Sequence, residues 1–170
     1  MTITVSIDLI VNDEDVRRTV EPRETLADFL RQGLQLTGTH VGCEMGVCGA
    51  CLVLVDDRPA HACLMFAVQA AGARVETIEG LTDRAAIADL QEAFHERNAL
   101  QCGFCTPGML VTAYGLLNGS DVPSREQIRD ALSGNYCRCT GYEAIVDAIE
   151  KVARQRAVNK ALSTLADAQT

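Results

Sequence analysis

The chain has 170 residues, of which 48% are hydrophobic and 22% are charged, so it is long enough for one or two small globular domains and is not disordered. Its formal net charge is −8 at pH 7, and it has neither a basic patch nor aromatic stacking residues, which argues against a nucleic-acid-binding protein. No hydrophobic run approaches the roughly 18 residues of a transmembrane helix, and no signal peptide begins the chain. We therefore expect a cytoplasmic protein without a membrane span.

Residues 1–78 predict a small sheet domain. The segments with the apolar pattern of strands are Ile3–Val11, Val16–Val20, the two arms of a hairpin at Cys51–Cys63 with its turn at residues 56–58, and Arg74–Ile78, which is expected to close the sheet. Between the second and third strands, Thr25 can cap a helix whose apolar face includes Leu26, Phe29 and Leu30. Two hairpins and one crossing helix indicate a β-grasp domain.

Residues 79–158 have hydrophobic residues at helical spacing instead. The expected helices are Ala85–Asn98, Pro107–Asn118, Arg125–Leu132 and Glu143–Ala157. Ser124 and Gln127 have the spacing of a capping box at the start of the third. The fold class is therefore predicted to be α+β, a β-grasp domain followed by a four-helix bundle, with residues 159–170 as a C-terminal tail that is a frayed helix or a loose segment.

Eight cysteines stand in two groups of four, and the first group has a specific spacing. It comprises Cys43-x4-Cys48-x2-Cys51, followed by Cys63. This spacing, together with one later cysteine, is that of plant-type [2Fe–2S] ferredoxins. Glycines recur through the loop, where they allow positive φ angles and let backbone N–H groups approach the sulfurs; they stand at positions 38, 42, 46 and 49.

The second group consists of two short pairs, Cys102-x2-Cys105 and Cys137-x-Cys139. Each pair alone is weakly informative, because such pairs occur in zinc sites, redox dithiols and iron–sulfur sites. Each pair precedes a predicted helix, and the partial positive charge of a helix N-terminus favours an anionic thiolate cluster. Two groups of four thiolates with none left over therefore predict two [2Fe–2S] clusters and a role in electron transfer.

Other interpretations compete with this one. Disulfides require an oxidising compartment, structural zinc fits the second group better than the first, and buried structural cysteines are common but seldom cluster in this way. His40, His61 and His95 are candidates for Rieske-type ligands, although the eight cysteines already suffice. Glu44 is expected to be a solvated loop charge rather than a base. The chain has no G-x-G-x-x-G motif and no P-loop, so it is not expected to bind FAD, NAD or nucleotide phosphates through such motifs.

Three motifs give the chain a close resemblance to a known family: Gly42–Cys51, Gln101–Gly108 and Gly134–Tyr142. They resemble those of the iron–sulfur subunit of the molybdenum hydroxylases. This is the xanthine dehydrogenase family, in its separate-subunit form, as in bacterial carbon monoxide dehydrogenase. The resemblance covers residues 2–155, and all eight cysteines have their counterparts.

The resemblance implies one [2Fe–2S] cluster in each domain. It implies that the first is held by Cys43, Cys48, Cys51 and Cys63, and the second by Cys102, Cys105, Cys137 and Cys139. It also implies two partners, a large subunit with a molybdenum pyranopterin (often the cytosine dinucleotide) and a medium FAD subunit, in a heterotrimer or a dimer of heterotrimers. Electrons would pass from molybdenum to the second cluster, then to the first, then to FAD.

Within the family, the glutamine that matches Gln101 hydrogen-bonds the pterin, and the cysteine that matches Cys139 lies against its exocyclic amine. The resemblance assigns substrate chemistry to the large subunit, so no catalytic residue is expected here. N-heterocycles, aldehydes, carbon monoxide and aryl-CoA esters are all compatible with this chain. The alternatives are a free-standing two-cluster carrier or redox sensor, the small subunit of a reductive aryl-CoA enzyme, and a complex that passes electrons to a cytochrome instead of flavin.

Overall fold

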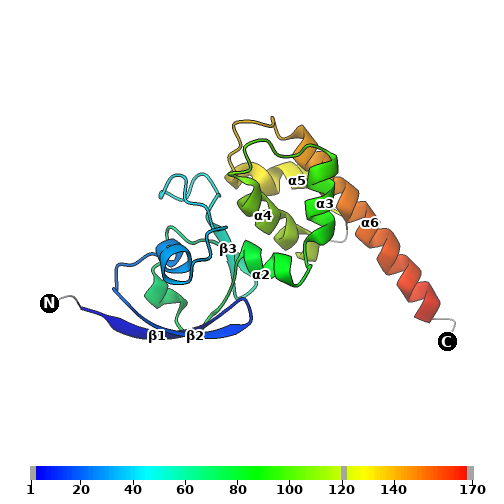
Figure 1. The fold of residues 1–170 in the computed structure, drawn as a ribbon. Coiled ribbons are helices and arrows are strands. Elements are labelled where there is room, and N and C mark those ends of the chain that lie inside the picture. Colours follow the sequence, from blue (N-terminus) through cyan, green and yellow to red (C-terminus); the bar gives the residue numbers. More distant parts are fainter. Residues whose placement is uncertain (1–2, 120–121, 168–170) are drawn as a thin grey trace.

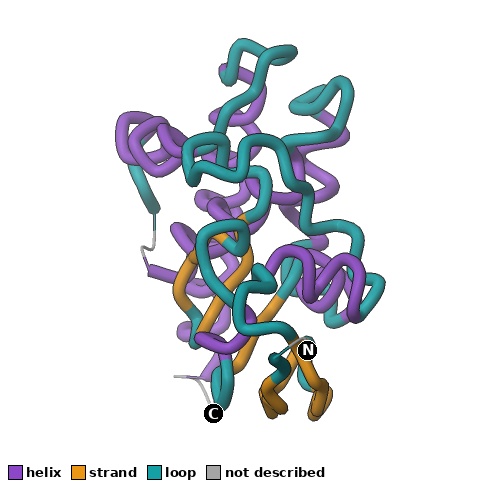
Figure 2. Tube along the Cα trace, turned by 90° about the vertical axis from the view of Figure 1, so that its left-hand side faces the viewer, coloured by secondary structure: helices purple, strands orange, loops and turns teal. Residues whose placement is uncertain are grey.

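The computed structural model describes residues 3–119 and 122–167. The N-terminal half forms a twisted sheet with one helical segment packed on it, and the C-terminal half is helical (Figure 1). Figure 2 shows the strands in the lower half of the molecule, with most of the helices above them. None of the described helices has both the length and the apolar character needed to cross a membrane.

The sheet has five strands in the order β2-β1-β5-β3-β4. Their bounds are Val5–Val11 for β1, Glu14–Val20 for β2, Leu52–Val55 for β3, Arg58–His61 for β4 and Arg74–Glu76 for β5. β1 is antiparallel to β2 and parallel to β5, and β3 is antiparallel to both β4 and β5. The last strand in the sequence is therefore the central strand of the sheet, where it joins the two hairpins.

Both hairpin turns use residues that tolerate a left-handed backbone. Asn12 and Asp13 have φ angles of 51° and 67°, and Asp56 and Asp57 have φ angles of 48° and 63°. Two consecutive positive φ angles are the signature of a tight turn whose twist matches that of the flanking strands. The expected second hairpin, with its turn at residues 56–58, is therefore confirmed.

The crossing helix begins at Thr25, as predicted. The Thr25 hydroxyl accepts a hydrogen bond from the backbone N–H of Asp28 at 3.1 Å, and α1 spans Leu26–Asp28 before widening into the π-helical turn η1 at Phe29–Gly33. Leu26, Phe29 and Leu30 are at most 1% exposed. They pack on the inner face of the sheet, so this segment closes the first hydrophobic core.

The predicted strand Arg74–Ile78 is too long by two residues. β5 ends at Glu76, and Ile78 starts a helix, α2 (Ile78–Asp83), that the sequence pattern did not reveal. The backbone N–H of Thr77 donates to the Asn12 side-chain oxygen at 2.9 Å, which turns the chain away from the sheet. A contact between residues so far apart gives no local sequence pattern from which the end of β5 could have been predicted. A short 3₁₀ helix, η2 (Ala67–Ala70), was also not predicted.

The remaining helices correspond to the four expected ones. They are α3 (Ala88–Glu96), α4 (Thr106–Gly119), α5 (Arg125–Ala131), which runs into the 3₁₀ turn η3 (Leu132–Gly134), and α6 (Glu143–Asp167). The Ser124 hydroxyl accepts from the N–H of Gln127 at 3.2 Å, and the Gln127 side chain accepts from the N–H of Ser124 at 2.7 Å, so the capping box is confirmed. α6 is ten residues longer than expected, because no glycine or proline interrupts residues 158–167.

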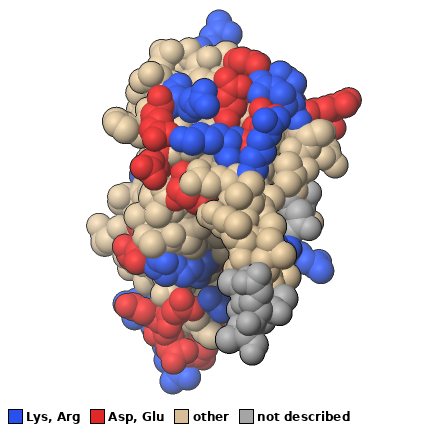
Figure 3. All heavy atoms as spheres, turned by 90° about the vertical axis from the view of Figure 1, so that its right-hand side faces the viewer, with Lys and Arg blue, Asp and Glu red and all other residues tan. Residues whose placement is uncertain are grey.

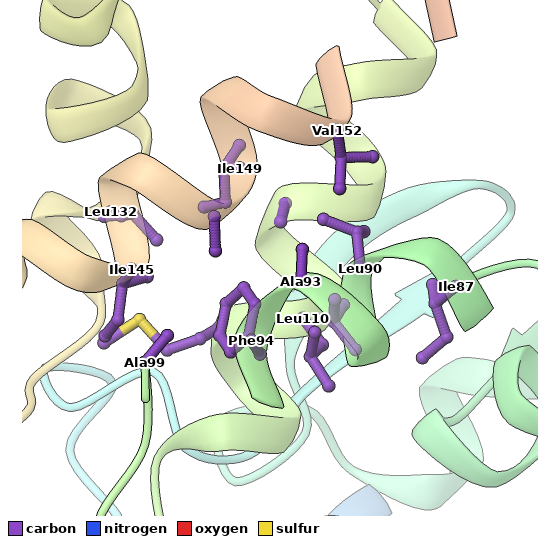
Figure 4. Packing of buried hydrophobic residues seen from close by; sticks show 14 of the residues in the cluster. Ile87, Leu90, Ala93, Phe94, Ala99, Leu110, Leu132, Ile145, Ile149 and Val152 are labelled. Atoms are coloured by element: carbon purple, nitrogen blue, oxygen red, sulfur yellow. The ribbon is translucent and has the colours of Figure 1, made fainter. Parts of the chain in front are cut away.

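Strand β3 connects the two halves. Val53 lies in the core of the sheet, whereas Leu54 on the opposite face lies in the core of the helices, and both are at most 2% exposed. Figure 4 shows the ring of Phe94 among helical side chains that include Leu110, Ile145 and Ile149. The two halves therefore pack directly on each other.

Positive and negative side chains are intermixed on the face of the molecule that Figure 3 shows.

Candidate metal centres

The first group of cysteines lies where the β3–β4 hairpin meets the long loop before it. Cys51 directly precedes β3 and Cys63 follows β4, and the N–H of Ala62 donates to the carbonyl oxygen of Cys51 at 3.3 Å. The hairpin thus brings together two residues that are distant in sequence. Cys51 and Cys63 are 1% and 8% exposed, while Cys43 and Cys48 are half-buried in the loop.

The loop surrounds Cys43 with hydrogen-bond donors. The N–H of Met45 donates to the Cys43 sulfur at 3.4 Å. This bond, with further ones from Cys48 and the backbone of Val47, lowers the pKa of Cys43 to about 6. Gly46 and Gly49 have φ angles of 73° and 69°, which allow the chain to wrap in this way. The arrangement stabilises a thiolate, which is the form that binds metal.

Burial has the opposite effect on Cys51. Its desolvation raises the pKa of the thiol to about 12. The side chain of Cys63 contributes to this shift, which places the two sulfurs beside each other. A buried thiol of this kind binds metal with release of its proton, because the metal supplies the positive charge that the apolar surroundings lack.

The second group lies at the N-terminal ends of α4 and α6, as predicted. Cys105 directly precedes α4, and the pair Cys137 and Cys139 lies in the loop before α6. The sulfurs of Cys102 and Cys139 are 3.7 Å apart, and both residues are exposed. Burial, followed by the neighbouring Cys137 thiol, raises the pKa of Cys105 to about 12. The structure therefore unites residues that are more than thirty positions apart.

Cys137 is stabilised as a thiolate. Burial alone would raise the pKa of this thiol, but hydrogen bonds from the Thr140 hydroxyl and from the N–H groups of Cys139 and Thr140 lower it below its usual value. The Thr140 hydroxyl lies 3.1 Å from the sulfur. Gly141 and Tyr142 both have φ angles of 68°, which turn the chain sharply between Cys139 and the start of α6.

The sulfurs of both groups are arranged in pairs. The pairs are Cys43 with Cys48, Cys51 with Cys63, Cys102 with Cys139, and Cys105 with Cys137. A [2Fe–2S] cluster has two irons and takes two thiolates at each. The paired donors therefore fit a binuclear cluster.

The other residues singled out in the sequence are distributed around these centres. Gln101 is exposed, and its side-chain amide donates to the carbonyl oxygen of Cys139 at 3.0 Å. Nδ1 of His40 lies 2.8 Å from the carbonyl oxygen of Phe104, and the two rings stack with centroids 4.8 Å apart. His61 lies in β4, and Glu44 is exposed in the first loop with a φ angle of 55°.

Two residues near the second group were not recognised from the sequence. The Tyr142 hydroxyl accepts from the N–H of Cys137 at 2.8 Å and donates to the carbonyl oxygen of Asn135 at 3.0 Å. Asn135 is 2% exposed. Neither residue type is a usual ligand of a [2Fe–2S] cluster, so only their positions within the motif Gly134–Tyr142 could have indicated a role.

The two groups of cysteines adjoin each other. The N–H of Tyr136 donates to the carbonyl oxygen of Cys48 at 2.8 Å, and the Asn135 side chain donates to the carbonyl oxygen of Gly49 at 3.2 Å. Tyr136 is bonded to Cys137 in the second group, while Gly49 lies between two cysteines of the first. The arrangement suits the passage of electrons between two nearby centres.

Comparison with known proteins agrees with this geometry. Residues 9–77 match the family model "2Fe-2S iron-sulfur cluster binding domain", and residues 77–150 match the model "[2Fe-2S] binding domain". The chain is 52% identical over 149 residues to caffeine dehydrogenase subunit gamma of Pseudomonas sp. (strain CBB1), covering 86% of this chain and 89% of that protein.

Two further relatives have similar coverage. The nicotine 6-hydroxylase small subunit of Paenarthrobacter nicotinovorans is 50% identical over 145 residues, which cover 85% of this chain and 87% of that protein. The crystal structure of quinoline 2-oxidoreductase from Pseudomonas putida 86 contains a chain that superposes with a TM-score of 0.81 and 46% identity, covering 89% of this chain and 97% of that chain.

Proposed function

Since the chain belongs to the family of small iron–sulfur subunits of the xanthine dehydrogenase-type molybdenum hydroxylases and is the electron-transfer subunit of an oxidoreductase, we propose that it joins a molybdenum subunit to a flavin subunit. The large partner would hold a molybdenum pyranopterin, in the form of its cytosine dinucleotide, and the medium partner would hold FAD. The three chains would form a heterotrimer, or a dimer of heterotrimers, in the cytoplasm. The second group of cysteines would hold the cluster that receives electrons, and the first group would hold the cluster that passes them on.

The paired sulfurs carry this proposal. We assign the first cluster to Cys43, Cys48, Cys51 and Cys63, and the second to Cys102, Cys105, Cys137 and Cys139. Bound iron–sulfur clusters supply one-electron redox chemistry. The chain itself fixes the thiolates, excludes water from the inner pair Cys51 and Cys63, and donates backbone hydrogen bonds to the sulfurs. No residue of this chain is assigned a part in bond-making chemistry.

Exposure at the second group supports an adjacent pterin. Gln101 and Cys139 are both exposed and are joined by a hydrogen bond, so one partner surface could reach both. We propose that the Gln101 side chain donates to or accepts from the pterin, and that Cys139 lies against it. Substrates of the complex would then resemble the N-heterocycles named for its relatives, caffeine, nicotine and quinoline.

We also propose a division of the chain that serves this arrangement. Residues 1–78 form a β-grasp domain for the first cluster, and residues 79–158, which contain α3 to α5 and the first part of α6, form a four-helix bundle for the second. Residues 159–170 form a C-terminal tail that begins with the end of α6, and its residues 168–170 lie outside the described part of the chain. The two hydrophobic cores support the division, because one lies under the sheet and the other lies between the helices.

The exposed hydrophobic residues favour a subunit over a free-standing carrier. Large apolar side chains are solvent-exposed on or beside the cysteine-bearing segments of both groups, namely Met45, Val47, Leu64, Phe104 and Tyr136. A free carrier would leave these side chains in water, whereas partner subunits would cover them.

The test is to isolate the tagged chain with its partners and compare Cys48→Ser and Cys137→Ser with a control, Met45→Leu, which changes an exposed loop side chain but no ligand. We expect molybdenum, flavin and about four irons per chain in the wild type and the control. Each Cys→Ser variant should lose the electron paramagnetic resonance signal of one cluster and the turnover with the physiological acceptor, while substrate still binds the complex. Haem in place of flavin would identify a cytochrome acceptor. Stoichiometric zinc, or unchanged turnover, would contradict the proposal.

A further inference from the structure

Asn135 is a buried polar residue placed between the two metal centres. All of its polar groups are engaged: its side-chain N–H donates to Gly49 O at 3.2 Å, and its side-chain oxygen accepts from the Thr112 hydroxyl at 2.9 Å. Its backbone N–H donates to Leu132 O at 2.9 Å, and its carbonyl accepts from the Tyr142 hydroxyl at 3.0 Å. A buried side-chain amide that is bonded through both its nitrogen and its oxygen is held in one orientation.

The next residue in the chain connects the two groups of cysteines through a single hydrogen bond. The N–H of Tyr136 donates to the carbonyl oxygen of Cys48 at 2.8 Å. Cys48 is one of the residues that we assign to the first cluster, and Cys137, which follows Tyr136, is one that we assign to the second. This hydrogen bond therefore completes a continuous path of covalent and hydrogen bonds from Cys48 to Cys137. An electron that follows this path does not have to cross a gap between non-bonded atoms.

Close backbone contact is built into this junction. Gly49 has a φ angle of 69°, and a Cβ atom at this position would lie 2.4 Å from the carbonyl oxygen of Gly134 and 2.6 Å from the side-chain nitrogen of Asn135. Only glycine lets the first loop approach so closely. The Asn135 amide then binds the carbonyl of Gly49, the residue adjacent to Cys48, and so fixes the position of the loop.

We propose that Asn135 is a positioning residue for electron transfer between the two clusters. Its side-chain N–H holds the Gly49 carbonyl, and this keeps the neighbouring Cys48 carbonyl in hydrogen-bonding contact with Tyr136. The inference rests on the proposed function, because it requires both clusters to be present. None of the hydrogen bonds described for Asn135 goes to a cysteine sulfur, so it acts through the backbone of the two cysteine-bearing loops.

The decisive variant is Asn135→Asp in the purified complex. The carboxylate retains an acceptor for the Thr112 hydroxyl, but it replaces the donor to Gly49 by an oxygen that repels the carbonyl. Asn159→Asp makes the same chemical change at an exposed position of α6 and is the matched control. The measurements are hydrogen–deuterium exchange of the backbone amides, the magnetic splitting between the two reduced clusters, and the rate at which the first cluster is reduced after the second in rapid-freeze experiments.

In Asn135→Asp we expect both cluster signals to remain. The protection of the Tyr136 amide from hydrogen exchange should fall about tenfold, because the buried side-chain donor that holds the neighbouring Gly49 carbonyl has been lost. The magnetic splitting between the two reduced clusters should become smaller, and the first cluster should be reduced more slowly than in the wild type. The control Asn159→Asp should match the wild type in all three measurements. Unchanged splitting and an unchanged rate would overturn the inference, as would a loss of protection spread evenly over the whole chain.

A second variant covers the case in which Asn135→Asp cannot hold its clusters. Thr112→Val removes the hydroxyl that orients the amide but keeps the donor to Gly49, so the same measurements should change in the same direction by a smaller factor. No change in Thr112→Val would then overturn the inference. A wild-type chain that held fewer than two clusters would contradict the proposed function instead, so the two failures are distinguishable.

Discussion

Gly108, in the first turn of α4, lies directly against the carbonyl oxygen of Gly49: a Cβ atom at Gly108 would be 2.1 Å from that oxygen. The contact joins the helix that follows Cys105 to the loop that carries Cys48. Backbone atoms cannot move aside as a flexible side chain can. The packing of the two halves therefore depends on the absence of a single methyl group.

We expect Gly108→Ala to destabilise the protein, although alanine ordinarily stabilises a helix relative to glycine. Overpacking against backbone costs about 1–3 kcal/mol, which corresponds to a fall in Tm of roughly 2–12 °C for a chain of this size. Gly119→Ala in the last turn of the same helix is the control, because no atom of the described residues beyond its own helix lies within 4 Å of its Cβ position. Thermal unfolding should show a lower Tm for Gly108→Ala and an unchanged Tm for Gly119→Ala. An unchanged Tm for Gly108→Ala would contradict the close contact.

The ion pair between Asp89 and Arg156 should give the stability a specific pH dependence. Two guanidinium nitrogens of Arg156 donate to the Asp89 carboxylate at 2.7 and 2.8 Å and join α3 to α6. Burial raises the pKa of Asp89, but the hydrogen bonds from Arg156 outweigh it and hold the pKa below its usual value. Because the folded-state pKa is depressed, the pair stabilises the fold above the unfolded-state pKa of about 3.9 and ceases to do so as the pH falls through the folded-state value.

Asp89→Asn should therefore reduce the free energy of unfolding by about 1 kcal/mol at pH 7, since the pair is partly exposed. The difference from the wild type should disappear at the acidic end of a denaturation series. Asp130→Asn, at an exposed position of α5, is the control and should leave the pH profile unchanged. A difference that stayed constant down to the lowest pH would mean that Asp89 contributes through packing rather than charge.

Phe94 should be among the most sensitive positions of the helical core. The ring is 1% exposed and is surrounded by side chains of neighbouring helices (Figure 4). Phe94→Ala would leave a cavity and lower the free energy of unfolding by about 3–5 kcal/mol, as measured by chemical denaturation. Phe66→Ala removes the same ring from a side chain that is 45% exposed, so its effect should be much smaller. Similar losses in the free energy of unfolding for both variants would contradict the placement of Phe94 in the helical core.

The end of α6 should be dispensable for the stability of the fold. Val158, Leu162 and Leu165 are each more than half exposed and lie on a part of the helix that extends away from the body (Figure 1). Truncation after Ala157 should change the free energy of unfolding by no more than about 0.5 kcal/mol. Truncation after Gln155 also removes Arg156, so it should reproduce the loss seen in Asp89→Asn. A large effect of the shorter deletion would show that these residues pack on the protein.

Much of the local structure is encoded in short stretches of sequence. The capping box at Ser124 and the turn at Asp56 and Asp57 depend on residues a few positions apart, and both were found where they were expected. Short stretches of sequence were also sufficient to predict that one cysteine pair precedes α4 and the other precedes α6. The end of β5 was misjudged, because Thr77 leaves the sheet through a bond to Asn12, 65 residues away.

The sequence by itself determined the donor chemistry of this protein: eight thiols in two groups, with the spacing that [2Fe–2S] clusters use, and hence a role in electron transfer. Only the tertiary structure decided how the two groups face each other. Asn135 and Gly108 carry no metal-binding chemistry, and their importance arises from contacts with Gly49 across the molecule. Ligand spacing is a property of neighbouring residues, whereas the distance between two centres depends on how the whole chain packs.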